Sequence, residues 1–327
     1  MGKKSFLITV DTEGDNLWAW KPGVKITTEN ESFLNRFQCL CNKYGYKPTY
    51  FTNYEMAVSD NFNRFIKPYL KSQQCEIGMH LHAWNSPPEY FLKNANNGGQ
   101  PFLIEYPYEI MEQKIKYVTD LLENRLEEKI VSHRAGRWVL NKEYTELLIK
   151  YGYLTDCSVT PHINWKAAKG SNKIVKGNNY KKYSEEPYWV FNKDQTGKIL
   201  EIPMTIREKF VYAIDKKTIK GVLKAGRDLV LGKKIWLRPN GKNLIEMKGL
   251  VDEIYLTDTE YIMFMIHSSE LMPGGSPYFR DRESIEKLYQ DMEDLFQYIR
   301  DRYLGETVKG FFNRWVEKYE NRNIDFS

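Results

Sequence analysis

Short apolar segments alternate with amphipathic helical segments along most of the chain. The apolar segments have the length and composition of strands, and they are Phe6–Val10, Pro48–Phe51, Glu76–His82, Lys129–His133, Leu154–Ser158, Ile199–Met204 and Tyr261–His267. Helical periodicity fills several of the intervals, at Glu31–Tyr44, Tyr108–Glu127, Asn141–Tyr151, Asn243–Ile254 and Asp281–Tyr303. Strands that alternate with helices predict an α/β fold with a parallel sheet built from βαβ units.

The strand segments follow one another without an internal repeat or a low-complexity linker. We therefore predict a single domain over residues 1–327, whose sheet closes like a barrel, rather than two domains. Residues 162–198 match no regular element well and are predicted to form an insertion in that domain. A basic helical segment is predicted within about residues 208–240, because apolar residues recur among lysines and arginines there.

The overall composition is that of an ordinary globular protein, with 42% hydrophobic and 28% charged residues. No apolar run reaches the ~18–20 residues of a membrane-spanning helix. We expect no secretory signal, because the acids Asp11 and Glu13 interrupt the first apolar stretch. The four cysteines are interpreted as small buried apolar residues in a reducing compartment, which predicts a cytoplasmic protein.

Positive charge is concentrated in the middle of the chain. Residues 162–246 contain 19 Lys and Arg against 8 Asp and Glu, whereas the whole chain carries a net charge of only +5. This favours an anionic partner such as a phosphate, a pyrophosphate or a lipid surface, although a solvated lysine-rich face would give the same pattern. For residues 211–230, a helix packed on the barrel is favoured over a peripheral membrane contact. Nucleic acid is not expected, since no recognised binding motif accompanies the charge.

Acidic residues follow the first predicted strand directly. Asp11 and Glu13 come after the apolar residues 7–10, and in extended backbone they share one face. The carboxyl ends of parallel strands carry the active sites of α/β folds. Two carboxylates so close together need a cation or an arginine to neutralise them, and a solvent-exposed acidic turn is the alternative.

Two of the five histidines lie two residues apart at the end of the third predicted strand. The side chains of His80 and His82 therefore project to the same side. A His-x-His pair on a strand is a common zinc-binding arrangement, in which an Asp or Glu completes the ligand set. This spacing predicts a divalent metal site.

Three later segments also place polar residues at strand ends. Arg134 follows an apolar stretch, where an arginine can bind a carboxylate and keep it ionised, and Gly136 would allow close approach of a ligand. Asp156 and Ser158 follow the next strand. His267 ends a strongly apolar strand and is expected at the barrel mouth. A surface salt bridge for Arg134 and a buried, hydrogen-bonded His267 are the alternatives.

Taken in order, the segments VDTEGD, EIGMHLHAW, SHRAGRW, YLTDCSVTP and MIHSSEL resemble the motifs of the NodB-homology polysaccharide deacetylases, the carbohydrate esterase family 4 superfamily. The resemblance extends from residue 5 to about residue 300. It implies a distorted (β/α)7 barrel and a divalent metal, usually Zn²⁺, held by two histidines and one acid. It also implies hydrolysis of an N-acyl group, usually N-acetyl, on a carbohydrate of surface-polysaccharide biosynthesis; the basic middle suggests that this sugar is linked to a nucleotide or a lipid phosphate.

The resemblance also implies roles for single residues. Asp11 matches the general base and Arg134 matches the arginine that orients it. His80 matches the first metal histidine, and Glu13 is the expected acidic metal ligand, although which of Asp11 and Glu13 contacts the metal stays open. His267 matches the general acid that protonates the leaving amine.

The chain departs from the family pattern at three places. The family's adjacent Asp-Asp pair is Asp11-Thr12 here, which leaves open whether Asp11 or Glu13 contacts the metal. The second metal histidine of the family lies four residues after the first, where this chain has Trp84, so His82 is expected to replace it. The Pro-aromatic pair expected after the motif arginine is replaced by Gly136 and Arg137, so the substrate site should differ here. The residues expected to contact the substrate are Trp84, Arg137, Trp138, Asp156 and Ser158.

Three other functions remain open from the residues alone. The first is hydrolysis of a different C–N bond, such as a formamide or a ring amide. The second is non-catalytic binding of a carbohydrate or lipid. The third is glycoside hydrolysis with Asp11 and Glu13 as paired acids, which would leave the His pair unexplained. The ligand types do not separate zinc from cobalt, nickel or iron.

Overall fold

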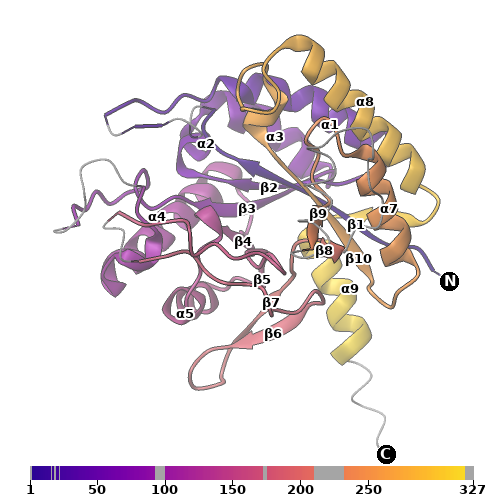
Figure 1. The fold of residues 1–327 in the computed structure, drawn as a ribbon. Coiled ribbons are helices and arrows are strands. Elements are labelled where there is room, and N and C mark those ends of the chain that lie inside the picture. Colours follow the sequence, from indigo (N-terminus) through magenta and orange to yellow (C-terminus); the bar gives the residue numbers. More distant parts are fainter. Residues whose placement is uncertain are drawn as a thin grey trace, which may run out of the picture.

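The computed structural model describes residues 2–15, 17, 20–21, 23–92, 100–171, 175–209 and 232–320. Its centre is a nine-stranded sheet with the order β10–β1–β2–β3–β4–β5–β7–β6, and β11 also pairs with β1 (Figure 1). The strands of this sheet are β1 (Lys4–Thr12), β2 (Thr49–Thr52), β3 (Glu76–Leu81), β4 (Ser132–Ala135), β5 (Thr155–Asp156), β6 (Tyr188–Phe191), β7 (Lys198–Glu201), β10 (Tyr261–His267) and β11 (Tyr303–Glu306).

All neighbouring strands of this sheet are parallel except β6 and β7, which form an antiparallel pair at its edge. The predicted parallel sheet is therefore confirmed, and each predicted strand is present. β1 is long enough to pair with two strands along one edge: Lys4–Leu7 pairs with β11 and Thr9–Thr12 with β2. The sequence pattern missed β6 and β11, because their four residues show little periodicity.

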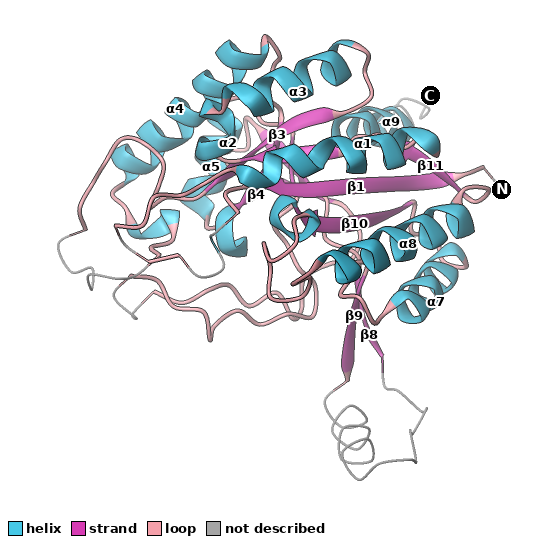
Figure 2. Ribbon diagram, turned by 90° about the horizontal axis from the view of Figure 1, so that it is seen from above, coloured by secondary structure: helices cyan, strands magenta, loops and turns pink. Residues whose placement is uncertain are grey.

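Helices pack against the sheet, most of them on its outside (Figures 1 and 2). They are α1 (Leu34–Lys43), α2 (Tyr54–Val58), α3 (Asp60–Lys71), α4 (Tyr108–Leu126), α5 (Lys142–Lys150), α7 (Leu244–Tyr255), α8 (Arg282–Ile299) and α9 (Val308–Glu320). The predicted helices correspond to α1, α4, α5, α7 and α8. The last prediction was too long, because the chain turns after Ile299 and Tyr303 already begins β11. α2, α3 and α9 were not predicted.

Alternate residues of the strands point to opposite sides of the sheet, and each side has its own apolar cluster. On β1, Phe6, Ile8 and Val10 belong to the large outer cluster that packs against the helices. Leu7 belongs to a smaller inner cluster, which includes residues of β2, β10 and α9. The members of this inner cluster are Leu7, Phe51, Cys157, Leu200, Ile202, Met204, Ile206, Tyr261, Met263, Met265, Val308 and Phe311. Helix α9 thus packs against the interior of the barrel.

The gap between β7 and β10 is closed by irregular backbone instead of a further strand of the sheet. Leu237 donates its N–H to the carbonyl of Thr205 (3.1 Å), and its own carbonyl accepts from the N–H of Met265 (3.1 Å). The hydroxyl of Thr205 also accepts from the N–H of Met263 (2.8 Å). The result is a curled, mostly parallel half-barrel that agrees with the predicted distorted (β/α)7 barrel.

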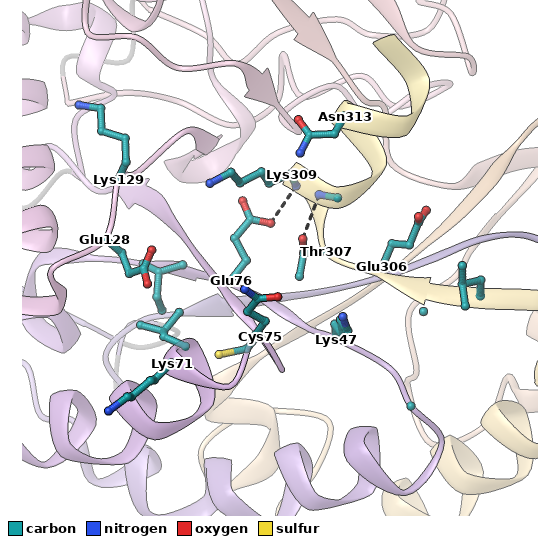
Figure 3. Close-up of a pocket in the computed structure, with 17 residues that line it drawn as sticks. Lys47, Lys71, Cys75, Glu76, Glu128, Lys129, Glu306, Thr307, Lys309 and Asn313 are labelled. Carbon is teal, nitrogen blue, oxygen red and sulfur yellow. Dashed lines mark hydrogen bonds between the residues drawn. The ribbon is translucent and has the colours of Figure 1, made fainter. Parts of the chain in front are cut away.

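The buried carboxyl group of Glu76 connects several elements near the start of β3 (Figure 3). It accepts hydrogen bonds from the hydroxyls of Thr49 (3.0 Å) and Ser132, and from the backbone N–H of Lys309 at the start of α9 (2.9 Å). A cavity of about 840 Å³ lies beside it, with four lysines in its wall. This cavity is at the amino ends of the strands and contains none of the residues predicted to form the site.

The predicted insertion at residues 162–198 is irregular for most of its length, but the prediction of no regular element was wrong at its end, where β6 pairs with β7. Most of the predicted basic helix, residues 210–231, lies outside the described residues. The segments on either side of it form a separate antiparallel pair, β8 (Ile206–Lys209) and β9 (Lys233–Trp236). Among the described residues, no helix has the length and apolarity needed to cross a membrane. The cysteines are free thiols, and Cys39 is exposed rather than buried as predicted.

Candidate metal and catalytic site

The strand register brings the predicted site residues together at the carboxyl end of the sheet. Asp11 at the end of β1 is the register partner of His267 at the end of β10. His80 on β3 is the register partner of Arg134 on β4. Residues that pair in parallel strands lie side by side on the same face of the sheet, so these four side chains converge although more than 250 residues separate the first from the last.

Glu13, His80 and His82 form a compact group of possible metal ligands, and all three are buried. Their ligand atoms lie within 4.8 Å of one another. The Oε2 atom of Glu13 is 3.4 Å from Nε2 of His80 and 3.1 Å from Nε2 of His82. The two Nε2 atoms are 3.0 Å apart. This geometry is compatible with the predicted ligand set. In that set, His82 takes the part of the family's second metal histidine, whose position is occupied by Trp84 in this chain.

The protonation pattern of the rings fits a cation. Nδ1 of His80 lies 2.9 Å from the backbone carbonyl of Arg134, which holds a proton on Nδ1 and leaves the lone pair of Nε2 facing Glu13 and His82. Such a hydrogen bond to the outer ring nitrogen is typical of metal-binding histidines. Without a proton or a cation between them, two Nε2 lone pairs at 3.0 Å would repel each other. The residues present therefore fit a divalent metal ion.

The site shifts the pKa values of its ligands in different directions. Burial raises the pKa of Glu13, but the neighbouring histidines outweigh it, and the net shift is downward. Burial lowers the pKa of His82 to about 3, so its ring is neutral and able to bind a metal at any ordinary pH. Burial also lowers the pKa of His80, but the carboxylates of Asp11 and Glu13 outweigh it and raise the pKa above 6.5.

Asp11 is held by Arg134 rather than by the histidines. Nη1 of the buried Arg134 donates to Oδ1 of Asp11 at 2.6 Å, and its Nε donates to the carbonyl of Cys157 at 3.0 Å. Burial raises the pKa of Asp11, but Arg134, His80 and His267 together outweigh it, and the pKa falls to about 2. The free oxygen, Oδ2, lies 3.9 Å from Nε2 of His267. The arrangement favours Glu13 over Asp11 as the candidate metal ligand and leaves Asp11 ionised beside it.

Two residues that the sequence analysis missed hold His267. Oε2 of Glu270 lies 3.2 Å from Nδ1 of His267 and accepts the backbone N–H of the same residue at 2.8 Å. Arg238 donates to Oε1 of Glu270 at 2.9 Å and its Nη2 lies 3.0 Å from Nδ1 of His267. Burial raises the pKa of Glu270, but Arg238 and His267 together lower it to about 2, so this carboxylate is ionised. Nε2 of His267 therefore faces the site, 3.7 Å from Oε1 of Glu13.

Asp156 and Ser158, which were expected to contact the substrate, are buried and do not line the pocket of the site. Oδ1 of Asp156 lies 2.5 Å from Nδ1 of His133 and accepts from the hydroxyl of Ser158 at 2.8 Å. The same hydroxyl accepts the N–H of Ala135 at 2.8 Å. Burial raises the pKa of Glu201, beside Asp156, well above its ordinary value. These residues support the segment that carries Arg134 from behind.

The other three residues predicted to contact the substrate, Trp84, Arg137 and Trp138, line a pocket of about 140 Å³ beside the candidate metal ligands. Trp84 stacks on the ring of His82, with 4.5 Å between ring centroids. Arg137 and Trp138 form part of the opposite wall. The described residues in the wall of this pocket are Asp11, Glu13, Leu17, His80, His82, Trp84, Gln100, Ala135, Arg137, Trp138 and His267. Leu17 and Gln100 were not predicted, because neither lies in a recognisable motif.

Gly136 leaves no room for a side chain next to the metal ligands. A Cβ atom at this position would lie 2.4 Å from Cδ2 of His82 and 2.4 Å from the carbonyl oxygen of Leu81. We expect Gly136→Ala to displace the His82 ring and to weaken metal binding roughly 10- to 100-fold, which metal titration of the purified variant would measure. Gly249→Ala is the matched control, because a Cβ there meets nothing within 4 Å. Unchanged metal affinity in Gly136→Ala would show that His82 is not a ligand.

Comparisons with known proteins were made for the sequence and for the structure. Neither the family models nor the curated proteins give a match to the sequence. Among solved structures, a candidate polysaccharide deacetylase from Mycobacterium smegmatis matches with a TM-score of 0.52 and 12% identity, over 98% of this chain and 92% of the other. A candidate glycoside hydrolase or deacetylase from Parabacteroides distasonis matches with a TM-score of 0.55 and 12% identity, over 98% and 72%. The chain has the polysaccharide deacetylase fold.

This fold does not by itself decide the chemistry. A 4-alpha-glucanotransferase from Thermococcus litoralis matches 95% of this chain with a TM-score of 0.51 and 12% identity, and the match covers 38% of that longer chain. Deacetylase and glucanotransferase structures thus share the architecture, and the reaction must be argued from the site.

Proposed function

We propose that the protein is a metal-dependent hydrolase that removes an N-acyl group, most simply N-acetyl, from a sugar used in surface-polysaccharide biosynthesis. The observation that carries this proposal is the buried group of Glu13, His80 and His82, with Asp11 and His267 beside it. Zinc is the first choice of metal, because two imidazoles and a carboxylate leave a fourth position open, as in catalytic zinc sites.

Each charged residue has a part in this reaction. A divalent ion held by Glu13, His80 and His82 would lower the pKa of a water molecule and polarise the acyl carbonyl group. Asp11, kept ionised by Arg134, takes the proton of the attacking water through Oδ2. His267 protonates the leaving amine nitrogen through Nε2, which faces the site, while Glu270 holds Nδ1 on the other side.

The site argues against the glycosidase alternative. A glycosidase needs one carboxylic acid that stays protonated near neutral pH, and hence has a raised pKa. Here the pKa of Asp11 is about 2 and that of Glu13 is lowered. Both carboxyl groups are therefore ionised, as metal binding and base catalysis require.

The direct test is acetate release from N-acetylhexosamines and their phosphorylated or glycan-linked derivatives, together with elemental analysis of the purified protein. Release of acetate by protein that holds about one divalent ion per chain supports the proposal. Formate release, or opening of a ring amide without acetate, would favour a different C–N hydrolase. A protein that binds the sugars and holds no divalent ion after reconstitution would be a non-catalytic relative.

The pH dependence should reveal competition between protons and the metal. Because the carboxylates of Asp11 and Glu13 raise the pKa of His80 above its ordinary value, its ring takes up a proton as the pH falls through this raised pKa, and the proton must leave when a metal binds. The acid limb of the activity profile should then follow His80, not Asp11 with its pKa of about 2. A tenfold increase in free metal should move the acid midpoint down by up to about one pH unit. A midpoint that does not depend on the metal concentration contradicts this assignment.

A further inference from the structure

Arg137 differs from the other described arginines that are not exposed, because no described carboxylate is within ion-pair distance of it; Glu105 acts on it electrostatically from farther away. Each of the other arginines there that is not exposed pairs with a carboxylate: Arg134 with Asp11, Arg207 with Glu185, Arg238 with Glu270, Arg302 with Asp252, and Arg314 with Glu306. Arg137 is also partly buried, yet no carboxylate of the described residues lies within ion-pair distance of it. A partly buried charge is costly without a counter-ion at close range, so this position favours the binding of an anion.

The side chain of Arg137 is nevertheless held in place. Nη1 donates to the carbonyl of Gln100, Nη2 donates to the carbonyl of Lys169 at 3.0 Å, and the guanidinium carbon lies 4.2 Å from the centroid of the Phe102 ring. A guanidinium group has five N–H groups, so three of them have no hydrogen-bond partner among the described residues. The arginine is therefore fixed in the pocket wall and still has N–H groups that can donate hydrogen bonds to a ligand.

The backbone at this position is strained in a way that suits a binding site. Arg137 and Trp138 both have positive φ angles, 58° and 62°, which residues other than glycine adopt only at a cost. Both side chains line the pocket, and Gly136 just before them packs against the metal ligand His82. The strained turn thus presents Arg137 to the space in front of the metal ligands.

We propose that Arg137 binds an anionic substituent, a carboxylate or a phosphate, on the N-acyl sugar. This inference rests on the proposed function and narrows its substrate to acidic or phosphorylated amino sugars. An arginine suits both anions, because its planar N–H fork matches the oxygens of a carboxylate and of a phosphate.

The test compares three probes that share the N-acetyl sugar: neutral N-acetylglucosamine, its 1-phosphate, and its analogue with a carboxylate at carbon 6. Affinities are measured by isothermal titration calorimetry on metal-loaded protein carrying His267→Ala, so that slow hydrolysis adds no heat. At least one anionic probe should bind roughly 10- to 100-fold more tightly than the neutral one. The probe that shows this preference identifies the anion. Equal binding of all three probes would overturn the inference.

Variants then show whether Arg137 is responsible for the preference for the anionic probe. Arg137→Gln should abolish it, and Arg137→Lys should keep part of it, because an ammonium group retains the charge but loses the fork. Lys166→Gln, which removes an exposed positive charge from the basic segment at residues 162–246, should leave it intact. A preference that survives in a folded Arg137→Gln protein would refute the assignment. The titrations measure binding and not hydrolysis. A failure to find acetate release would therefore contradict the proposed function but would not decide whether Arg137 binds the anion.

Discussion

Replacement of His80 by alanine is expected to remove the bound metal and to reduce deacetylation on the order of 10³-fold or more, since the metal is expected to supply several kcal/mol of transition-state stabilisation. The physical reason is that His80 contributes a ligand atom and also orders the site, because its Nδ1 is bound to the carbonyl of Arg134 at 2.9 Å. With alanine, Glu13 and His82 remain, and two protein ligands hold a divalent ion poorly. Elemental analysis and acetate release measure the two effects.

The control for His80→Ala is His162→Ala. The ring of His162 pairs with Glu185 at 2.5 Å and does not line the pocket, so its loss should leave the metal content unchanged. A comparison of thermal midpoints shows whether the variants fold, and His80→Asn offers a second, more similar replacement. If folded His80→Ala binds the metal as tightly as the wild type, the proposed ligand set is wrong.

The sequence allowed the metal ligands to be predicted because the signal is local. A His-x-His pair at a strand end projects both rings to one side whatever the rest of the fold does. Which of Asp11 and Glu13 is the acidic metal ligand could not be predicted in the same way. It depends on Arg134, which lies 123 positions further along the chain and pairs with Asp11 across the barrel. No local pattern contains that information.

Asp156 was predicted to contact the substrate, but its side chain lies on the other face of the sheet. Asp156 is the register partner of His133, not of Arg134, so it lies on the face of the sheet opposite to the one that carries the arginine. A shift of one residue would have placed it in the site. β5 has only two residues, so its sequence shows no alternation from which the facing could be read.

Of the two residues that hold His267, one could have been predicted from the local sequence and the other could not. Glu270 follows His267 by three residues in a short 3-10 turn, Ser268–Leu271, so the His-Ser-Ser-Glu spacing could have indicated it. Arg238 comes from a segment after β9 that has no motif, and only the fold brings it to Nδ1 of His267. The strand pattern thus predicted the barrel and the strand ends that meet at its carboxyl side, whereas the contact between Arg238 and His267 required the structure.

His267→Ala is expected to lower kcat by ~10²–10⁴, the usual contribution of a general acid, while the protein keeps its metal. Nε2 of His267 lies 3.7 Å from Glu13 and 3.9 Å from Asp11, beside the ligand group rather than within it. Glu270→Gln should lower kcat less, because it removes a partner of the ring and not the ring itself. Rates of acetate release and metal content are measured for both variants, with the exposed Glu283→Gln as control.

The double variant separates a shared role from two independent ones. If Glu270 acts through His267, then adding Glu270→Gln to His267→Ala should cause little further loss, since the group that Glu270 holds is already absent. Two independent roles would instead multiply the two losses. Loss of the metal in His267→Ala would move this histidine into the ligand set and remove it from the role of acid, because a ring nitrogen bound to a metal has no proton to give to the leaving amine.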